Sequence, residues 1–251
     1  MNTELSLLMG IPSPDLAELA LRAGFTSVIV DGEHGFPMDR TLRDFVGPTR
    51  ASGGSCLVRF TSDESRRAGF LADVGLDGFV LSGPRTPDDV HDVVRRIRFA
   101  PIGERSVNPF VPAAGEPGDI PSLRDSAANL QIWAMAENRS FLESMEATIE
   151  QDPASLGTWT GIIIGPYDLS ADLGCAPDPS DPLLQETVRR FVALAEKAQI
   201  KWSIFTRNDD HLTRWREHGV DPKYVLFGYD RDIWFVECLR RVSLFRAMSQ
   251  G

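Results

Sequence analysis

Six ionisable side chains of the sequence stand where short apolar runs end. They comprise four acids, one histidine and one arginine: Asp31, Glu33, His34, Arg59, Glu137 and Asp168. Glu137 and Asp168 are 31 residues apart, close to one strand–helix repeat, so their carboxylates would converge at adjacent strand ends. Two carboxylates supply the hard oxygen ligands that suit Mg²⁺ or Mn²⁺. The alternative is that each carboxylate caps the following helix or pairs with an arginine such as Arg139.

His34 is the histidine placed at a strand end. The other three lie in predicted helices, where we expect them to be solvated: His91, His211 and His218. Asp31, three residues before His34, could orient the imidazole as a general base, although a structural role for His34 stays open. Arg59 would be a cation among apolar neighbours, which is costly unless it meets a carboxylate of the protein or of a substrate.

Two other kinds of site are an anion-binding turn and a Schiff-base lysine. Residues 165–170 (GPYDLS) turn out of a strand and could offer backbone N–H groups to an anion, although tight turns often look like this for steric reasons. The chain has three lysines, of which Lys201 and Lys223 start predicted strands and Lys197 lies on a helix. None is placed for a Schiff base at the carboxyl ends of the strands, so stabilising a carbanion would require a metal.

Short apolar runs alternate with segments of helical period, which is typical of βα units around a parallel sheet. The eight runs cover residues 5–9, 27–31, 56–60, 78–81, 132–136, 161–164, 202–205 and 224–227. Helix starts are readable at Ser13, Thr86 and Asn208, and helix ends at Gly24 and Gly219. Eight units without a linker predict one α/β domain over residues 1–251, a (β/α)₈ barrel whose catalytic groups lie at the carboxyl ends of its strands.

Two segments depart from this regular alternation. Residues 105–129, first rich in Pro and Gly and then helical, form an insertion between the fourth and fifth units, typical of a lid or an interface. Residues 230–248 read as an amphipathic helix that either closes the barrel or packs on a partner, core packing being the commoner outcome.

Composition excludes several classes of function. The net charge of −10 does not fit a nucleic-acid or anionic-membrane surface, and we expect neither partner. No apolar run reaches the roughly 20 residues of a transmembrane helix, and no basic stretch suggests a secretory signal. The three scattered cysteines read as reduced, buried thiols. We therefore expect a cytoplasmic enzyme.

These residues occur in motifs that resemble the HpcH/HpaI aldolase/citrate lyase family. The motifs are residues 30–34 (VDGEH), 57–59 (LVR), 99–106 (FAPIGERS), Glu137 and 164–171 (IGPYDLSA), in the family's order and spacing. The best fit is to the metal-dependent class II 2-oxo-acid aldolases. The resemblance implies a barrel of the phosphoenolpyruvate/pyruvate type and reversible cleavage of a 4-hydroxy-2-oxo acid to pyruvate and an aldehyde. It also implies a homo-oligomer, a hexamer or trimer of dimers that exchange the final helix.

The resemblance also implies roles for individual residues. Glu137 and Asp168 would hold a divalent metal, Mg²⁺ or Mn²⁺, with Co²⁺ or Zn²⁺ also compatible. Arg59 would stabilise the enolate oxygen, and His34, oriented by Asp31, would act as the base on the 4-hydroxyl group through a metal-bound or nearby water. The remaining residues that the resemblance implies would bind the substrate carboxylate or support the site: Gly165, Pro166 and Tyr167 for binding, Glu33 and Asp73 for support.

Departures from the family pattern surround the pocket and leave the substrate open. Met135 replaces a glutamine, residues 82–85 (Ser82 to Arg85) replace a V-P-M-V run, and Tyr167 stands where a small residue is common. The family's aromatic residue after the first strand is missing from residues 7–12 (LLMGIP). Three alternatives remain: oxaloacetate decarboxylation with capture of the enolate, cleavage of an acyl-CoA, and a catalytically inactive ligand-binding barrel.

Overall fold

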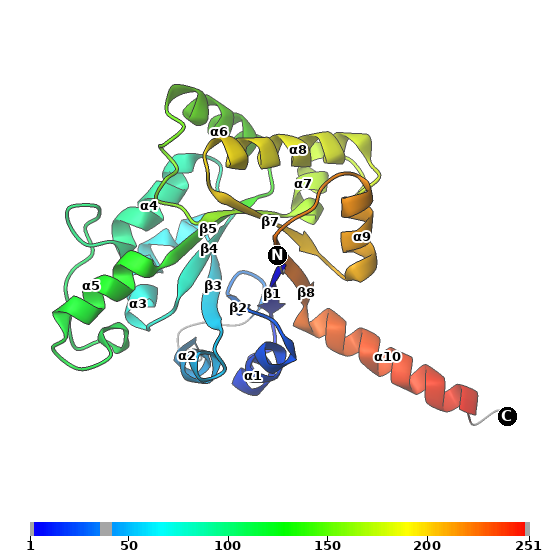
Figure 1. Cartoon of the computed structure of the whole chain (residues 1–251), viewed down its shortest axis with the longest axis horizontal. Helices are drawn as coiled ribbons and strands as arrows, with labels where there is room; N and C mark the ends of the chain where they lie inside the picture. Colours follow the sequence, from blue (N-terminus) through cyan, green and yellow to red (C-terminus); the bar gives the residue numbers. More distant parts are fainter. Residues whose placement is uncertain (1–2, 36–41, 249–251) are drawn as a thin grey trace.

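Eight parallel strands close into a barrel in chain order, with β8 returning to pair with β1 (Figure 1). The computed structural model describes residues 3–35 and 42–248. The strands are β1 Glu4–Met9, β2 Ser27–Asp31, β3 Ser55–Thr61, β4 Gly78–Ser82, β5 Gln131–Ala136, β6 Gly161–Ile164, β7 Lys201–Thr206 and β8 Tyr224–Tyr229. The predicted (β/α)₈ barrel is therefore confirmed, and every strand overlaps an apolar run of the sequence.

Helices follow the strands, and all of them except the last, α10, lie around the outside of the barrel (Figure 1). They are α1 Pro14–Ala23, α2 Leu42–Ala51, α3 Ala68–Asp73, α4 Pro87–Ile97, α5 Ile120–Asn129, α6 Arg139–Gln151, α7 Pro166–Leu173, α8 Pro182–Lys197, α9 Asp209–Glu217 and α10 Asp230–Met248. The readable helix starts are confirmed, since Ser13 and Asn208 accept backbone N–H groups of α1 and α9 and Thr86 opens a capping box at α4. Gly24 ends α1 with a φ of 116°, a conformation that glycine favours.

The alternation of side chains along each strand aims the polar residues into the mouth. Buried apolar residues fill the barrel interior: Leu8, Ile29, Leu57, Val80, Trp133, Met135, Ile163 and Leu226. Because every second residue of a strand faces the same side, the residues two positions after four of these also point inward. They are Asp31, Arg59, Ser82 and Glu137, and they stand at the carboxyl ends of β2 to β5. The opposite strand faces pack beneath the helices in the larger core.

The insertion at residues 105–129 does not cover the mouth. It follows α4, which returns the chain to the amino-terminal end of the barrel, and Arg98 there donates to the carbonyl of Leu130 just before β5. The segment builds its own small core around Leu123 and Ala114 against Phe99. The lid interpretation is therefore wrong, because the catalytic mouth lies at the other end of the strands.

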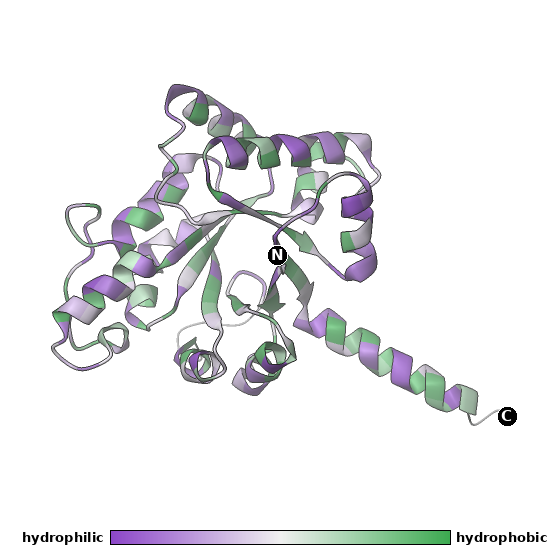
Figure 2. Cartoon of the chain, in the orientation of Figure 1, coloured by the Kyte–Doolittle hydropathy of each residue, from purple (hydrophilic) through white to green (hydrophobic). Residues whose placement is uncertain are grey.

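Helix α10 projects away from the barrel (Figure 1), with apolar and polar residues alternating along its whole length (Figure 2). Trp234 and Phe235 are 63% and 61% exposed, and exposed apolar residues occur on every side of the helix. The expectation of an amphipathic helix packed on its own barrel is therefore wrong. Its first residue, Asp230, anchors it by accepting the backbone N–H groups of Gly10 and Ile11, each at 2.9 Å.

The cysteines are free, as expected, but only Cys56 is buried, whereas Cys175 and Cys238 are half-buried. Burial raises the pKa of Cys56 to about 12, so it is an inert thiol. Within residues 3–35 and 42–248, no helix combines the length and the apolar character needed to cross a membrane.

Candidate active site

An ion pair between Arg59 on β3 and Asp31 on β2 forms one side of the mouth. The guanidinium donates twice to the carboxylate, from Nε to Oδ1 at 2.9 Å and from Nη2 to Oδ2 at 2.8 Å. The side chain of Asp31 is fully buried and that of Arg59 is 9% exposed. The third guanidinium nitrogen, Nη1, lies 3.2 Å from Oε2 of Glu33. Arg59 therefore meets carboxylates, as its burial requires.

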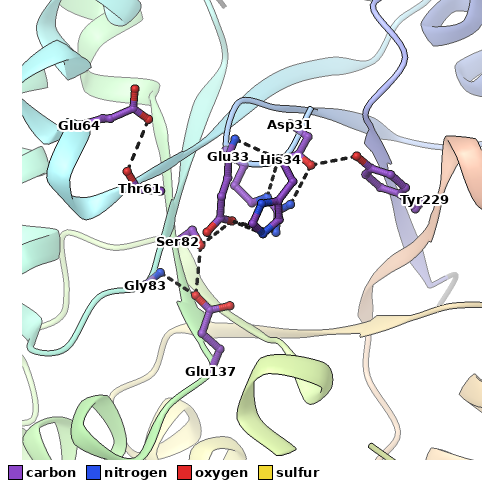
Figure 3. A network of polar contacts seen from close by, with 10 residues as sticks. Asp31, Glu33, His34, Thr61, Glu64, Ser82, Gly83, Glu137 and Tyr229 are labelled. Atoms are coloured by element: carbon purple, nitrogen blue, oxygen red, sulfur yellow. Dashed lines mark hydrogen bonds and ion pairs between the residues drawn. The ribbon is translucent and has the colours of Figure 1, made fainter. Parts of the chain in front are cut away.

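Asp31 is surrounded by donors. Besides Arg59, its oxygens accept the backbone N–H groups of Glu33 and His34 and the hydroxyl of Tyr229 (Figure 3). Burial alone would raise the pKa of Asp31, but the bonds and charge of Arg59, with the other donors, outweigh it and hold the pKa below its ordinary value. Asp31 therefore stays ionised throughout the neutral range.

The imidazole of His34 does not contact Asp31. The backbone N–H of His34 donates to Oδ1 of Asp31 at 3.2 Å, while the side chain is 69% exposed and its Nε2 lies 3.9 Å from Oε2 of Glu33. The expectation that Asp31 orients the His34 ring is therefore not met in this structure. Arg59 takes the carboxylate because it can pair with both oxygens at once.

Ser82, at the end of β4, links two carboxylates of the site. Its hydroxyl lies 2.7 Å from Oε2 of Glu33 and 3.2 Å from Oε1 of Glu137 (Figure 3). The same Oε1 accepts the backbone N–H of Gly83 at 2.6 Å. Because a hydroxyl has one proton, Ser82 donates to one of the two carboxylates at a time. One oxygen of Glu137 is thus fixed by β4, and the carboxylate is held in a single orientation.

The other oxygen of Glu137, Oε2, is buried and has no hydrogen-bond partner. Burial raises the pKa of Glu137 to about 7; the N–H of Gly83 opposes the shift, and the charges of Asp168 and Glu33 add to it. A buried carboxylate that has one oxygen without a hydrogen-bond partner, close to two further acids, is suited to bind a cation. The residues present therefore fit a divalent metal held by Glu137 and Asp168. Among the residues that the structure describes, no three His, Cys, Asp or Glu side chains form a metal site, so further ligands would be water or substrate oxygens.

The helix-capping alternative does not apply to Glu137. Asn138 is the residue that caps α6, since its side chain accepts the N–H of Phe141 at 2.9 Å. Arg139 pairs with Asp172 and not with either candidate ligand. Asp168 lies in the first turn of α7 and is exposed toward the mouth cavity that it lines with Arg59.

The turn after β6 can offer fewer amides than the sequence suggested. The N–H of Gly165 donates to the carbonyl of Ala136, and Pro166 has no N–H. The first-turn amides of Tyr167 and Asp168 remain, because helix geometry gives them no intrahelical acceptor. Space at Gly165 is tight: a Cβ there would stand 3.1 Å from Cε of Met135 and 3.2 Å from Oε2 of Glu137, so these side chains would have to shift.

A cavity of about 150 Å³ lies between Arg59 and Asp168. Its walls are otherwise mostly apolar and include Leu8, Met135, Phe205 and Leu226, with Tyr167 and Gly165 completing the lining. The ring of Tyr167 packs against that of Phe205 at 5.8 Å between centroids. The cavity therefore has one cationic wall and one acidic wall above an apolar floor.

His211 lies behind this aromatic pair and is 9% exposed, so the expectation that it is solvated is wrong. Its Nδ1 accepts the backbone N–H of Arg207, and burial lowers the pKa of its imidazole. His91 is half-buried and contacts the carbonyl of Ser155 at 3.1 Å. Both histidines fill structural positions. His211 packs on the rings of Tyr167 and Trp215, and His91 joins α4 to the loop that contains Ser155.

Asp73 is not brought to the mouth by this chain. It ends α3, at the amino-terminal end of the barrel, where its carboxylate pairs with Arg105 at 2.6 Å. The lysines lie away from the mouth, as predicted: Lys201 starts β7 with its Nζ over the ring of Tyr224, Lys223 precedes β8 and Lys197 ends α8.

Sequence reasoning gave no role to Tyr229, and it placed Ser82 and Gly83 near the pocket only as departures from the family pattern. Strand alternation places Ser82 inward two residues after Val80, so that signal was present in the sequence. Arg85, at the end of the same departure from the family pattern, donates to the hydroxyl of Ser140 at 3.2 Å on the exposed rim. The contact of Tyr229 with Asp31 depends on a strand bulge, which no local pattern predicted.

The comparison with protein families decides the assignment of the chain. The model for HpcH/HpaI aldolase/citrate lyase matches residues 7–230, which include all eight strands in whole or in part. The chain belongs to this family. A 4-hydroxy-2-oxo-heptane-1,7-dioate aldolase of Shigella sonnei is 25% identical over 228 residues, covering 90% of this chain and 84% of the relative. A 2-keto-3-deoxy-L-rhamnonate aldolase of Klebsiella pneumoniae is 25% identical over 256 residues, covering 99% and 91%.

Solved structures agree on the fold of this HpcH/HpaI family member. The crystal structure of an HpcH/HpaI aldolase from Desulfitobacterium hafniense matches with a TM-score of 0.82 at 23% identity. The match covers 98% of this chain and 93% of that one. The barrel therefore belongs to an architecture already seen in this family, while the substrate is left to the residues of the pocket.

Proposed function

We propose that this chain is a divalent-metal-dependent carbon–carbon lyase that cleaves a 4-hydroxy-2-oxo acid to pyruvate and an aldehyde. The observation that carries the proposal is the buried, unpaired Oε2 of Glu137, close enough to Asp168 to feel its charge, where Asp168 lines a small cavity together with Arg59. The names of the two aldolase relatives agree with this reaction class. Their different substrates leave the aldehyde open.

The reaction needs a place for negative charge and a base. As the C3–C4 bond breaks, the proton of the 4-hydroxyl passes to a base and the electron pair goes to C3, giving the enolate of pyruvate and an aldehyde. The enolate then takes a proton at C3 to give pyruvate. Mg²⁺ or Mn²⁺ held by Glu137 and Asp168 would polarise the 2-oxo group as a Lewis acid.

Chain residues supply the remaining functions. Arg59 donates toward the oxygen that becomes the enolate oxygen, and its ion pair with Asp31 fixes the plane of the guanidinium. The amides of Tyr167 and Asp168 receive the substrate carboxylate at the start of α7. His34 accepts the hydroxyl proton: its ring is exposed at the mouth, and Glu33 lies within 3.9 Å of Nε2 to stabilise the imidazolium that forms.

The test is pyruvate release from a panel of 4-hydroxy-2-oxo acids and oxaloacetate by chelator-stripped protein, with and without Mg²⁺ or Mn²⁺. We expect metal-restored pyruvate from at least one hydroxy-oxo acid, with the aldehyde formed in equal amount. Pyruvate from oxaloacetate alone would replace the aldolase assignment by a decarboxylase. Absence of activity on every substrate, despite metal binding, would favour a non-catalytic barrel.

We further propose that the chain works as a homo-oligomer in which α10 packs against a second copy, in a hexamer or trimer of dimers. The support is the exposure of apolar side chains on every side of α10, such as Trp234, Phe235 and Met248. The three free cysteines suit a reducing compartment, and we place the enzyme in the cytoplasm. Light scattering on the purified protein tests the assembly, and a monomer at micromolar concentration would contradict it.

A further inference from the structure

The phenol of Tyr229 reaches Asp31 from the end of β8, across β1. Its hydroxyl donates to Oδ2 of Asp31 at 3.1 Å, although 198 residues separate the two in the chain (Figure 3). Burial and the charge of Asp31 raise the pKa of Tyr229 to about 12, so the phenol keeps its proton and remains a donor. Oδ2 of Asp31 therefore accepts hydrogen bonds from two donors, the phenol of Tyr229 and Nη2 of Arg59.

The backbone of two strands is shaped around this contact. Ser6 pairs with Leu226 but Leu8 pairs with Tyr229, so β8 carries one extra residue at this point. That bulge includes Gly228, whose φ of 83° is a conformation that glycine favours. Bulges near active sites re-aim the side chain that follows them, which here is Tyr229.

Gly10 provides the space that the ring needs. It follows β1 where the phenol crosses, and a Cβ at this position would overlap the hydroxyl of Tyr229. The sequence lacks the family's aromatic residue in this stretch after the first strand, and the structure places an aromatic ring from β8 over it instead.

The contact fixes the carboxylate that fixes Arg59. With Oδ2 held from two sides and Oδ1 by Arg59 and two backbone amides, the plane of the Asp31 carboxylate has no freedom to rotate. The two parallel bonds of the pair transmit that plane to the guanidinium. The third guanidinium nitrogen of Arg59, Nη1, is thereby directed to the side of the mouth where Glu33 and Glu137 lie.

We propose that Tyr229 is a positioning residue of the lyase: it holds Asp31 so that Arg59 meets the oxygen on which the enolate charge develops. This inference rests on the proposed function. Because the enolate carries more charge on that oxygen than the bound 2-oxo acid does, misplacing Arg59 weakens the transition state more than the ground state. The effect therefore falls on kcat and not on KM.

The first experiment compares Tyr229→Phe with wild type in steady-state pyruvate release. We expect kcat to fall about 10-fold while KM changes less than about twofold. Tyr224→Phe is the matched control, since Tyr224 begins the same strand at the other end of the barrel, and its kcat should stay within about twofold of wild type. A kcat of Tyr229→Phe within that same range would overturn the proposal.

Two further variants show whether the effect passes through Arg59. In an Arg59→Lys background, adding Tyr229→Phe should lower kcat by less than about twofold, because the group that Tyr229 positions is already lost. An undiminished 10-fold loss there would mean that Tyr229 acts by another route. Gly10→Ala displaces the phenol without altering it. This variant should reproduce the kcat loss of Tyr229→Phe and should still unfold in a cooperative thermal transition, which shows that it is folded.

Binding of oxalate separates this inference from the proposed function. Oxalate is planar and dianionic like the enolate of pyruvate, so in the presence of Mn²⁺ its Kd should rise about 10-fold in Tyr229→Phe, against less than about twofold for pyruvate. If wild type cleaves its substrate and the oxalate Kd is unchanged in the variant, the inference alone fails. If wild type cleaves nothing, the proposed function fails and the oxalate-to-pyruvate ratio still decides the role of Tyr229. A wild type that binds no oxalate contradicts both.

Discussion

Glutamine at position 137 should stabilise the metal-free protein at high pH. Burial, with the charges of Asp168 and Glu33, raises the pKa of Glu137 from 4.5 to about 7 in the folded chain. The folded state therefore binds this proton more tightly than the unfolded state. Its contribution to stability is complete below pH 4.5 and is lost as pH rises through about 7. Over those 2.5 pH units the loss is about 3 kcal/mol in the free energy of unfolding.

Glu137→Gln removes this titration and keeps the side-chain shape, including an oxygen that accepts the N–H of Gly83. The Tm difference between variant and wild type should therefore grow by roughly 6–12 °C between pH 4.5 and pH 8 in chelator-treated samples. Groups that do not interact with Glu137 titrate alike in both proteins and cancel in the difference. Glu143→Gln, at an exposed position of the neighbouring α6, is the matched control and should give a flat difference.

Adding Mg²⁺ or Mn²⁺ tests the same carboxylate as a ligand. At a free metal concentration 100-fold above Kd, binding stabilises the wild type by about 2.7 kcal/mol. Glu137→Gln should lose most of that gain, since one of the two protein ligands is gone. A Tm difference that stays within about 2 °C across the pH range would refute the raised pKa of Glu137. An equal metal response in both proteins would refute its role as a ligand.

Three further outcomes are expected. Arg59→Lys should lower kcat for pyruvate release by about 10²–10³-fold, because lysine cannot keep the two parallel bonds to Asp31 and donate to an oxyanion as well; a loss below about 10-fold would contradict that role. Ser82→Ala should weaken metal affinity about 10-fold in calorimetric titration, because it removes the hydroxyl that donates to Glu33 or to Glu137, and unchanged affinity would show that the N–H of Gly83 suffices to hold Glu137. Phe235→Glu should shift the protein toward monomer in light scattering without altering the far-UV spectrum, whereas an unaltered assembly would show that α10 contacts no other copy.

Local patterns were enough to predict the barrel. Apolar runs of four or five residues, spaced by capped amphipathic helices, leave few arrangements other than a closed parallel sheet in a chain of 251 residues. The barrel order then places Asp31, Arg59, Glu137 and Asp168 at one end, so the mouth was predicted with the fold. The orientation of α10 was not predicted, since a helix read as amphipathic has no signal for whether its own barrel or another chain covers it.

Partner choice within the mouth could not be read from spacing. His34 lies three residues from Asp31, and proximity in sequence suggested a pair. Arg59 and Tyr229 occupy that carboxylate instead, because strands far apart in the chain become neighbours only when the barrel closes. A buried carboxylate is stabilised most by the donors that can reach it in pairs or from a fixed backbone, and these came from β3, the β2 loop and the bulged β8. The exposed imidazole, left outside this arrangement, keeps the freedom to meet a substrate hydroxyl at the mouth.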